Sequence, residues 1–180
     1  NFKGHKDRVN SAVFSPGGGR VLTASGDRTA KLWNATTGKL LQNFKGHKDR
    51  VNSAVFSPGG GRVLTASRDG TAKLWDATTG KVVQNFERHV LEVTSPVFSP
   101  GRGLQVLTGS QDGTAKLWGL ATGKILHNFK GHKDRVNSAV FSPGGRQVLT
   151  ASQDGTAKLW DATTGKLLQD IVKHGIEDPV

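Results

Sequence analysis

Asp154-Gly155-Thr156-Ala157-Lys158-Leu159-Trp160-Asp161 is the stretch around which the rest of this sequence is organised. It returns with small changes at 27–34, 69–76 and 112–119, and every copy places an aspartate six residues before a tryptophan. All four tryptophans of the chain lie in these copies, at spacings of 42, 43 and 42 residues. A fixed period of this length indicates a repeat architecture, in which each unit buries its apolar surface against the next unit.

The repeat extends over nearly the whole chain, so we expect a single repeat domain. The first two copies differ at only five positions, which indicates tandem duplication, natural or engineered. The third copy diverges most, because it reads Glu87-Arg88-His89-Val90-Leu91-Glu92-Val93-Thr94 and gains one residue in the turn after Ser99. The predicted repeats cover about residues 1–42, 43–84, 85–127 and 128–170, and a C-terminal tail follows at 171–180.

Each copy has the pattern of four short strands joined by turns. In the first copy Val9–Ser15 alternates two sets of side chains, Ser15–Gly19 is a turn, and Val21–Ser25 is a β-branched run. Thr29–Trp33 and Lys39–Phe44 complete the unit. No segment keeps the apolar period of about 3.6 residues that a helix requires. The expected fold is therefore all-β, with four four-stranded antiparallel sheets.

Four motifs of the second copy, with their counterparts in the other copies, resemble the WD40-repeat family. These motifs are Gly46-His47, Phe56-Ser57-Pro58-Gly59-Gly60, Ser67-Arg68-Asp69-Gly70 and Lys73-Leu74-Trp75-Asp76. They recur at the period of that family, about 40–45 residues. The resemblance implies β-propeller blades, in which each sheet is one blade beside a central channel.

Three departures from the family pattern concern turns. Asn34 and Gly119 stand where the aspartate of the Trp-Asp dipeptide is expected, so a turn contact is in question in these two copies. Arg28 replaces the turn glycine of the first copy, which predicts a slightly strained turn.

The resemblance also implies a buried hydrogen-bonded set in every blade, formed by a histidine, a serine or threonine, an aspartate and the tryptophan. A buried carboxylate or imidazole is costly unless it is paired, and a buried indole N–H needs an acceptor. Thr23, two residues before Ser25 on the same strand face, is the alternative hydroxyl in the first copy. The expected network residues are His5, Ser25, Asp27, Trp33, His47, Ser67, Asp69, Trp75, His89, Ser110, Asp112, Trp118, His132, Ser152, Asp154 and Trp160.

The fourfold recurrence of this set argues against an enzyme. A hydrolase needs one nucleophile with an oxyanion hole and a substrate cleft, not four equivalent sets within a repeated core. Thr37-Gly38-Lys39 lacks the first glycine of a phosphate-binding loop and leads into a strand rather than a helix. One histidine per repeat, without a partner four residues away, does not make a metal site. We therefore expect no catalysis, no cofactor and no metal.

In propellers of this family, residues just after the histidine and just before the aspartate line one face, which implies a partner-binding face here. Its basic side chains indicate a platform for an acidic protein or peptide, and the alternative is a solvated rim repeated by duplication. Nucleic acid is less favoured, because no aromatic side chain is interleaved with the basic ones to stack on bases. The expected face consists of Arg8, Asn10, Arg50, Asn52, Arg68, Glu92, Thr94, Gln111, Arg135, Asn137 and Gln153.

Four blades are few for a closed ring, since propellers hold four to eight blades and members of this family most often have seven. We expect a half-propeller that homodimerises into an eight-bladed ring by twofold symmetry. At the junction Asn1-Phe2 and Asp170-Ile171 compete for one strand position, and we predict that Lys166–Val172 keeps it. The alternative is a fragment or engineered excerpt of a longer array whose only intrinsic activity is self-assembly.

Composition sets the remaining bounds. The formal charge of +11 favours acidic partners, and the absence of cysteine excludes disulfides and thiolate metal sites. No apolar run has the length that a membrane span needs, so no membrane association is expected. The compartment is not determined, although the lack of cysteine favours the cytoplasm. The absence of methionine favours a processed or excised piece of a longer chain.

Overall fold

The computed structural model describes residues 2–172, and within this range every regular element is a β-strand. The strands form four antiparallel sheets of four, each in chain order. The first sheet contains β1 (Val9–Phe14), β2 (Arg20–Ser25), β3 (Thr29–Asn34) and β4 (Leu40–Lys45). The second contains β5 (Val51–Phe56), β6 (Arg62–Ser67), β7 (Ala72–Asp76) and β8 (Val82–Phe86). The third contains β9 (Val93–Phe98), β10 (Gln105–Ser110), β11 (Thr114–Gly119) and β12 (Ile125–Lys130). The fourth contains β13 (Val136–Phe141), β14 (Gln147–Ser152), β15 (Thr156–Asp161) and β16 (Leu167–Val172).

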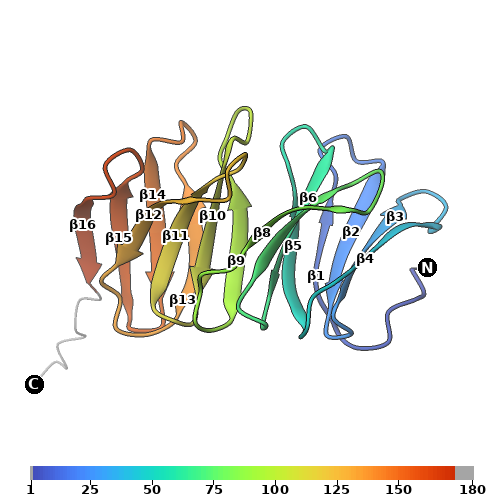
Figure 1. Cartoon of the computed structure of the whole chain (residues 1–180), viewed down its shortest axis with the longest axis horizontal. Coiled ribbons are helices and arrows are strands. Elements are labelled where there is room, and N and C mark those ends of the chain that lie inside the picture. The colour runs from blue at the N-terminus through green and yellow to red at the C-terminus, as the bar shows by residue number, and fades with distance from the viewer. Residues whose placement is uncertain (1, 173–180) are drawn as a thin grey trace, which may run out of the picture.

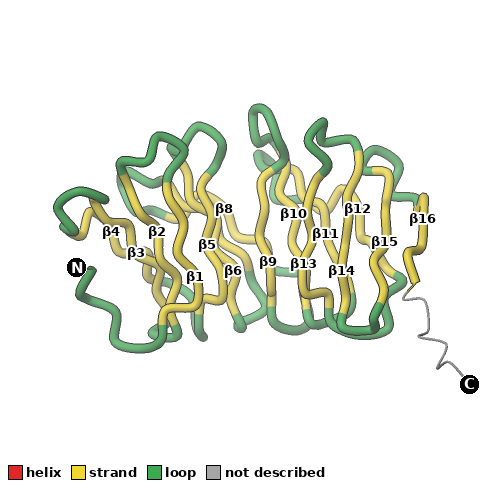
Figure 2. The backbone as a smooth tube through the Cα atoms, turned by 180° about the vertical axis from the view of Figure 1, so that it is seen from behind, coloured by secondary structure: helices red, strands yellow, loops and turns green. Residues whose placement is uncertain are grey.

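The four sheets stand side by side in an open row, with β1–β4 at one end and β13–β16 at the other (Figure 1). The same row seen from behind shows that loops join the strands at both edges (Figure 2). The first and last sheets do not meet. The arrangement is that of WD40-type blades in a half-propeller, which confirms the predicted fold class.

Apolar side chains fill the three spaces between neighbouring sheets. The first space holds Leu22, Leu32 and Phe44 from one sheet against Val63 and Trp75 from the next. Equivalent clusters fill the second and third spaces. A sheet inside the row is therefore covered on both faces, and its central strands are buried along most of their length. The central strands β6 and β10 show runs of buried residues rather than strict alternation.

The turn contact that the sequence put in question is absent at Gly119 but present at Asn34. The Asp76 Oδ1 atom accepts hydrogen bonds from the backbone N–H groups of Thr78 and Thr79, at 3.1 and 2.8 Å. Asn34 makes the equivalent contacts in the first blade, whereas Gly119 has no side chain with which to make them. Arg28 has a φ of 68°, in the left-handed region that favours glycine, so the expected strain is present in that turn.

The last outer strand is completed within the chain, as predicted. β16 pairs with β15 through to Val172, so Ile171 and Val172 lie in the sheet where the tail was expected to begin. Asn1 and residues 173–180, which include most of the expected tail, lie outside the described residues. At the other end the Phe2 ring lies against the Trp33 ring, with centroids 5.7 Å apart. Phe44 contacts Trp75 in the same way at 5.6 Å, so Phe2 occupies the place of a residue from a preceding blade.

Candidate functional site

Each blade contains a buried chain of polar side chains that links its outer loop to its tryptophan. In the second blade the His47 Nδ1 atom is 2.9 Å from Asp69 Oδ2, and His47 Nε2 is 2.7 Å from Thr65 Oγ1. The Trp75 indole N–H donates to the same threonine oxygen at 2.9 Å. The other three blades repeat these contacts with distances between 2.7 and 3.0 Å.

The hydroxyl in this network belongs to a threonine, not to the predicted serine. Thr65 lies in the middle of β6, at the depth of the indole, whereas Ser67 is the last residue of the strand. The Ser67 hydroxyl accepts from the Asp69 backbone N–H at 3.1 Å and donates to the Arg50 carbonyl at 2.9 Å, so it fixes the turn instead. The linking hydroxyls are Thr23, Thr65, Thr108 and Thr150, and the turn serines are Ser25, Ser67, Ser110 and Ser152.

The protonation states of the network follow from its hydrogen bonds. Burial by itself raises the pKa of the Asp112 carboxyl, but bonds from His89 and Thr114 outweigh burial and hold the pKa well below its usual range. Asp27, Asp69 and Asp154 show the same balance. Burial lowers the pKa of the His89 ring. A neutral His89 ring that donates from Nδ1 to Asp112 can accept the Thr108 proton at Nε2, so the side chains of this network satisfy one another.

The network of the second blade is closed off from solvent. Thr65 is fully buried, and His47 is buried beside it. The same set recurs in all four blades, and its proton donors and acceptors already satisfy one another. The arrangement locks the outer loop onto the blade, which is a structural role.

Three residues of the expected partner-binding face join neighbouring blades instead. The Asn10 side chain donates to the Val51 carbonyl at 2.8 Å, and the Asn52 side chain donates to the Val93 carbonyl at 2.9 Å. Thr94 donates to the carbonyl of the fourth blade's Val136 at 2.7 Å. These side chains stabilise the three junctions and are not free to bind a partner.

Glu92 places a negative charge among the basic side chains of that face. Its carboxylate accepts from the Asn52 amide at 2.9 Å and lies 3.8 Å from Arg50 and 4.0 Å from Arg68. Arg8 donates to Asn10 within its own blade at 3.0 Å. The basic side chains are therefore partly paired within the chain.

A polar groove remains on this face between the first two blades. It has a volume of about 460 Å³, and Arg8, Arg50 and Arg68 line it together with two aspartates, Asp7 and Asp49. Gln111 and Arg135 are half-buried, and Asn137 and Gln153 are exposed. The partner-binding face stays a prediction, and the pairing of Glu92 needed the three-dimensional arrangement.

Among residues 2–172 no three histidine, aspartate or glutamate side chains are placed to hold a metal ion. This part of the chain also has no helix long and apolar enough to cross a membrane.

The fold and the repeated network define a β-propeller type of repeat protein, built from blades that stack through apolar faces. The family model "WD domain, G-beta repeat" matches residues 1–34, 38–76, 80–119 and 123–161. The chain belongs to the WD40 family. Each match after the first starts near the outer strand of one blade and ends with the third strand of the next, so the family unit is offset from the blade.

Two curated relatives match short parts of the chain. It is 45% identical over 40 residues to "Ribosome assembly protein 4" of Chaetomium thermophilum, which is 22% of this chain and 8% of the relative. It is 56% identical over 41 residues to "U4/U6 small nuclear ribonucleoprotein PRP4-like protein" of Arabidopsis thaliana, which is 23% of this chain and 7% of the relative. The matches span about one repeat and less than a tenth of either relative.

Proposed function

We propose that the protein is a non-enzymatic interaction scaffold that completes its propeller by pairing with a second copy of itself. The WD40 family is generally a scaffold fold, and both relatives are named for multi-component assemblies. The observation that carries the proposal concerns the two open faces of the row. The open face of the first blade carries the residues that contact the preceding blade at an internal junction, and the open face of the last blade carries those that contact the following blade.

Apolar residues exposed on the two open faces are the counterparts of residues that are covered at an internal junction. Phe14 of the first blade is 70% exposed, whereas its counterpart Phe56 is half-buried against the preceding blade. Leu149 of the last blade is 38% exposed, whereas its counterpart Leu64 is fully buried. Exposed apolar surface of this kind marks an interface, because water is displaced from both halves when they meet.

The polar halves correspond as well. Asn137 stands where Asn10 and Asn52 stand in the first two blades, and it is exposed. The carbonyl of Val9 is equivalent to those of Val51 and Val93, which accept the bonds across the first and second junctions. A second copy would let Asn137 donate to Val9 of its partner and restore the missing bond.

Twofold symmetry makes two identical junctions from one pair of complementary faces. Eight blades lie within the range seen in closed propellers. Further repeats in a longer chain would fill the same faces, and the self-assembling excerpt of a longer array is therefore the competing explanation.

The junction also requires a change at Trp33. Ile171 is the counterpart of Phe44 in the last blade and is 46% exposed. In the ring Ile171 would contact Trp33 of the partner copy. In the single chain, Phe2 covers the Trp33 of its own chain. We infer that Phe2 yields this position when the ring closes.

The mass of the 180-residue chain in solution tests the proposal. We expect a dimer at micromolar concentration, and we expect Phe14→Glu and Leu149→Glu each to give a folded monomer, because each buries a charge at both junctions. Val90→Glu is the matched control, since Val90 is exposed on a loop of the third blade away from both open faces. A wild-type monomer, or an open series of larger assemblies, would contradict ring closure.

An acidic protein or peptide in the groove of Arg8, Arg50 and Arg68 is the second candidate. The three guanidinium groups in one groove favour it. Replacing these three arginines and Arg135 by glutamine should abolish capture of an acidic partner without changing the mass of the assembly. Unchanged capture would leave assembly as the only activity.

A further inference from the structure

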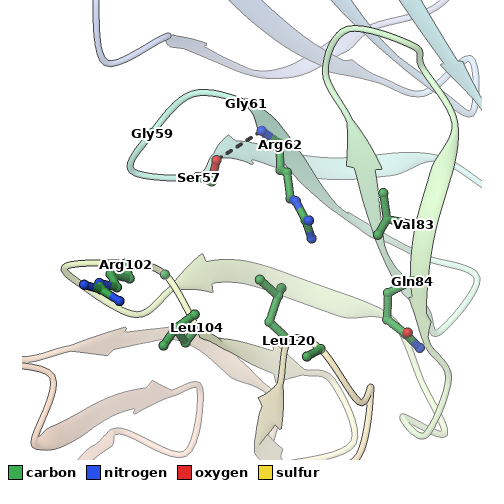
Figure 3. A pocket seen from close by; sticks show the side chains of 11 residues that line it. Ser57, Gly59, Gly61, Arg62, Val83, Gln84, Arg102, Leu104 and Leu120 are labelled. Carbon is green, nitrogen blue, oxygen red and sulfur yellow. Dashed lines mark hydrogen bonds between the residues drawn. The ribbon is translucent and has the colours of Figure 1, made fainter.

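A pocket of about 830 Å³ lies between the second and third blades, at the strand ends opposite the partner-binding face (Figure 3). Turns of both blades and the outer strand β8 form its walls. Its lining comprises Ser57, Gly59, Gly61, Arg62, Val83, Gln84, Arg102, Gly103, Leu104, Leu120 and Ala121. All of these residues belong to one chain, so the pocket is independent of ring closure.

Two leucines specific to the third copy form the apolar floor. The Leu120 backbone N–H donates to the Leu104 carbonyl at 3.0 Å. The same bond in the second blade joins Ala77 to Gly61, so a glycine and a buried alanine are replaced by two large apolar side chains. Leu104 is 66% exposed. In the view of Figure 3, Val83 lines the side of the pocket opposite Leu104, and Leu120 lies between them.

The pocket is open because a bridge found at the other two junctions is missing. Gln42 donates to the Thr78 carbonyl of the next blade at 2.5 Å, and His127 donates to the Thr163 carbonyl at 2.8 Å. Gln84 is the equivalent residue, but it donates to Asn85 on its own strand at 3.0 Å. Gln84 therefore does not make this hydrogen bond to the turn of the third blade that carries Leu120.

The pocket carries positive charge. Arg62 points into the space between the Gly59–Gly61 turn and Leu120, and Arg102 stands near the mouth (Figure 3). No acidic side chain lines the pocket. Within residues 2–172 neither guanidinium group takes part in an ion pair, although Asp76 on the neighbouring strand is the register partner of Arg62 and feels its charge.

We propose that this pocket binds a peptide segment in which aliphatic or aromatic side chains are flanked by carboxylates. The apolar side chain would cover Leu104, Leu120 and Val83 and displace water from them. The carboxylates would pair with Arg62 and Arg102, whose planar groups match carboxylate geometry. A pocket of this volume, with a mainly apolar floor and few polar groups, has the make-up of a specific ligand site.

The probe for this proposal is an acetylated and amidated tetrapeptide of glutamate, leucine, phenylalanine and glutamate. The full chain labelled with ¹⁵N is titrated, and the backbone amide resonances of Gly61, Leu104 and Ala121 are followed. We expect these resonances to shift and saturate with a Kd of about 1 mM or below. The same peptide with glutamine in place of glutamate should bind about tenfold more weakly, because the charge-assisted bonds are lost.

Two variants restore residues that other copies carry and therefore keep the fold. Leu104→Gly and Leu120→Ala should each weaken binding about tenfold, as should Arg62→Gln, because each removes part of the floor or charge. Arg146→Gln is the matched control, since Arg146 lies in the equivalent turn of the fourth blade and should leave binding unchanged. Equal binding of both peptides, unaltered binding by the pocket variants, or shifts confined to the open faces at Phe14 and Leu149 would each overturn the proposal.

Discussion

Thr65 is the residue on which the polar network of the second blade depends, so its replacement gives the sharpest test. Thr65→Val keeps the shape and β-propensity of the side chain but removes the oxygen shared by His47 and Trp75. One ring nitrogen and one indole N–H then remain buried without a partner. Each such group costs about 1–3 kcal/mol, so we expect the free energy of unfolding to fall by about 2–6 kcal/mol. Thr65→Ser keeps the oxygen and loses only a methyl group, which costs about 1 kcal/mol.

Equilibrium unfolding in urea, followed by circular dichroism and tryptophan fluorescence, measures this difference. With a denaturant dependence of about 2 kcal/mol per M, the midpoint of the valine variant should shift down by about 1–3 M. Exchange of the Trp75 indole proton with solvent should accelerate, while the Trp118 indole proton in the next blade serves as an internal control. A valine variant within about 0.5 kcal/mol of the serine variant would refute the role given to this hydroxyl.

Arg28→Gly should raise the free energy of unfolding by about 1 kcal/mol, because it removes a side chain from a left-handed backbone position. Gly70→Arg, at the equivalent turn of the second blade, should lower it, and thermal melting of both variants measures the two changes. Stability should also fall as the pH drops from about 7.5 to 5: burial lowers the pKa of His89, so the unfolded chain binds more protons than the folded one and the stabilisation present at higher pH is lost on acidification. Melting temperatures across this range should show a smaller slope for His89→Gln than for the wild type.

The blades were predictable from the sequence because their information is local and repeated. Spacing of the tryptophans, alternation along the strands and glycines in the turns each favour the same four-stranded unit. The identity of the linking hydroxyl was not predictable, since Thr65 and Ser67 are two residues apart on one strand face. Only the depth of the indole in the folded blade separates them.

The surface was less predictable than the core, because surface contacts join residues from different copies. The family pattern predicted a partner-binding face. However, Asn10, Asn52 and Thr94 bond across junctions, and Glu92 pairs with two arginines. The pocket over Leu104 and Leu120 brings together two turns that the sequence presents as unrelated departures.

The sequence by itself determined the blade, its number of copies and the absence of helix, because strand pairing within a repeat depends on short-range patterns. Tertiary structure decided which side chains are free. Stacking buries Leu64 but leaves Leu149, its counterpart, exposed, although the two lie in nearly the same local sequence. Identical residues differ only in whether a neighbouring blade excludes water from them, and that difference produces the open faces of the row.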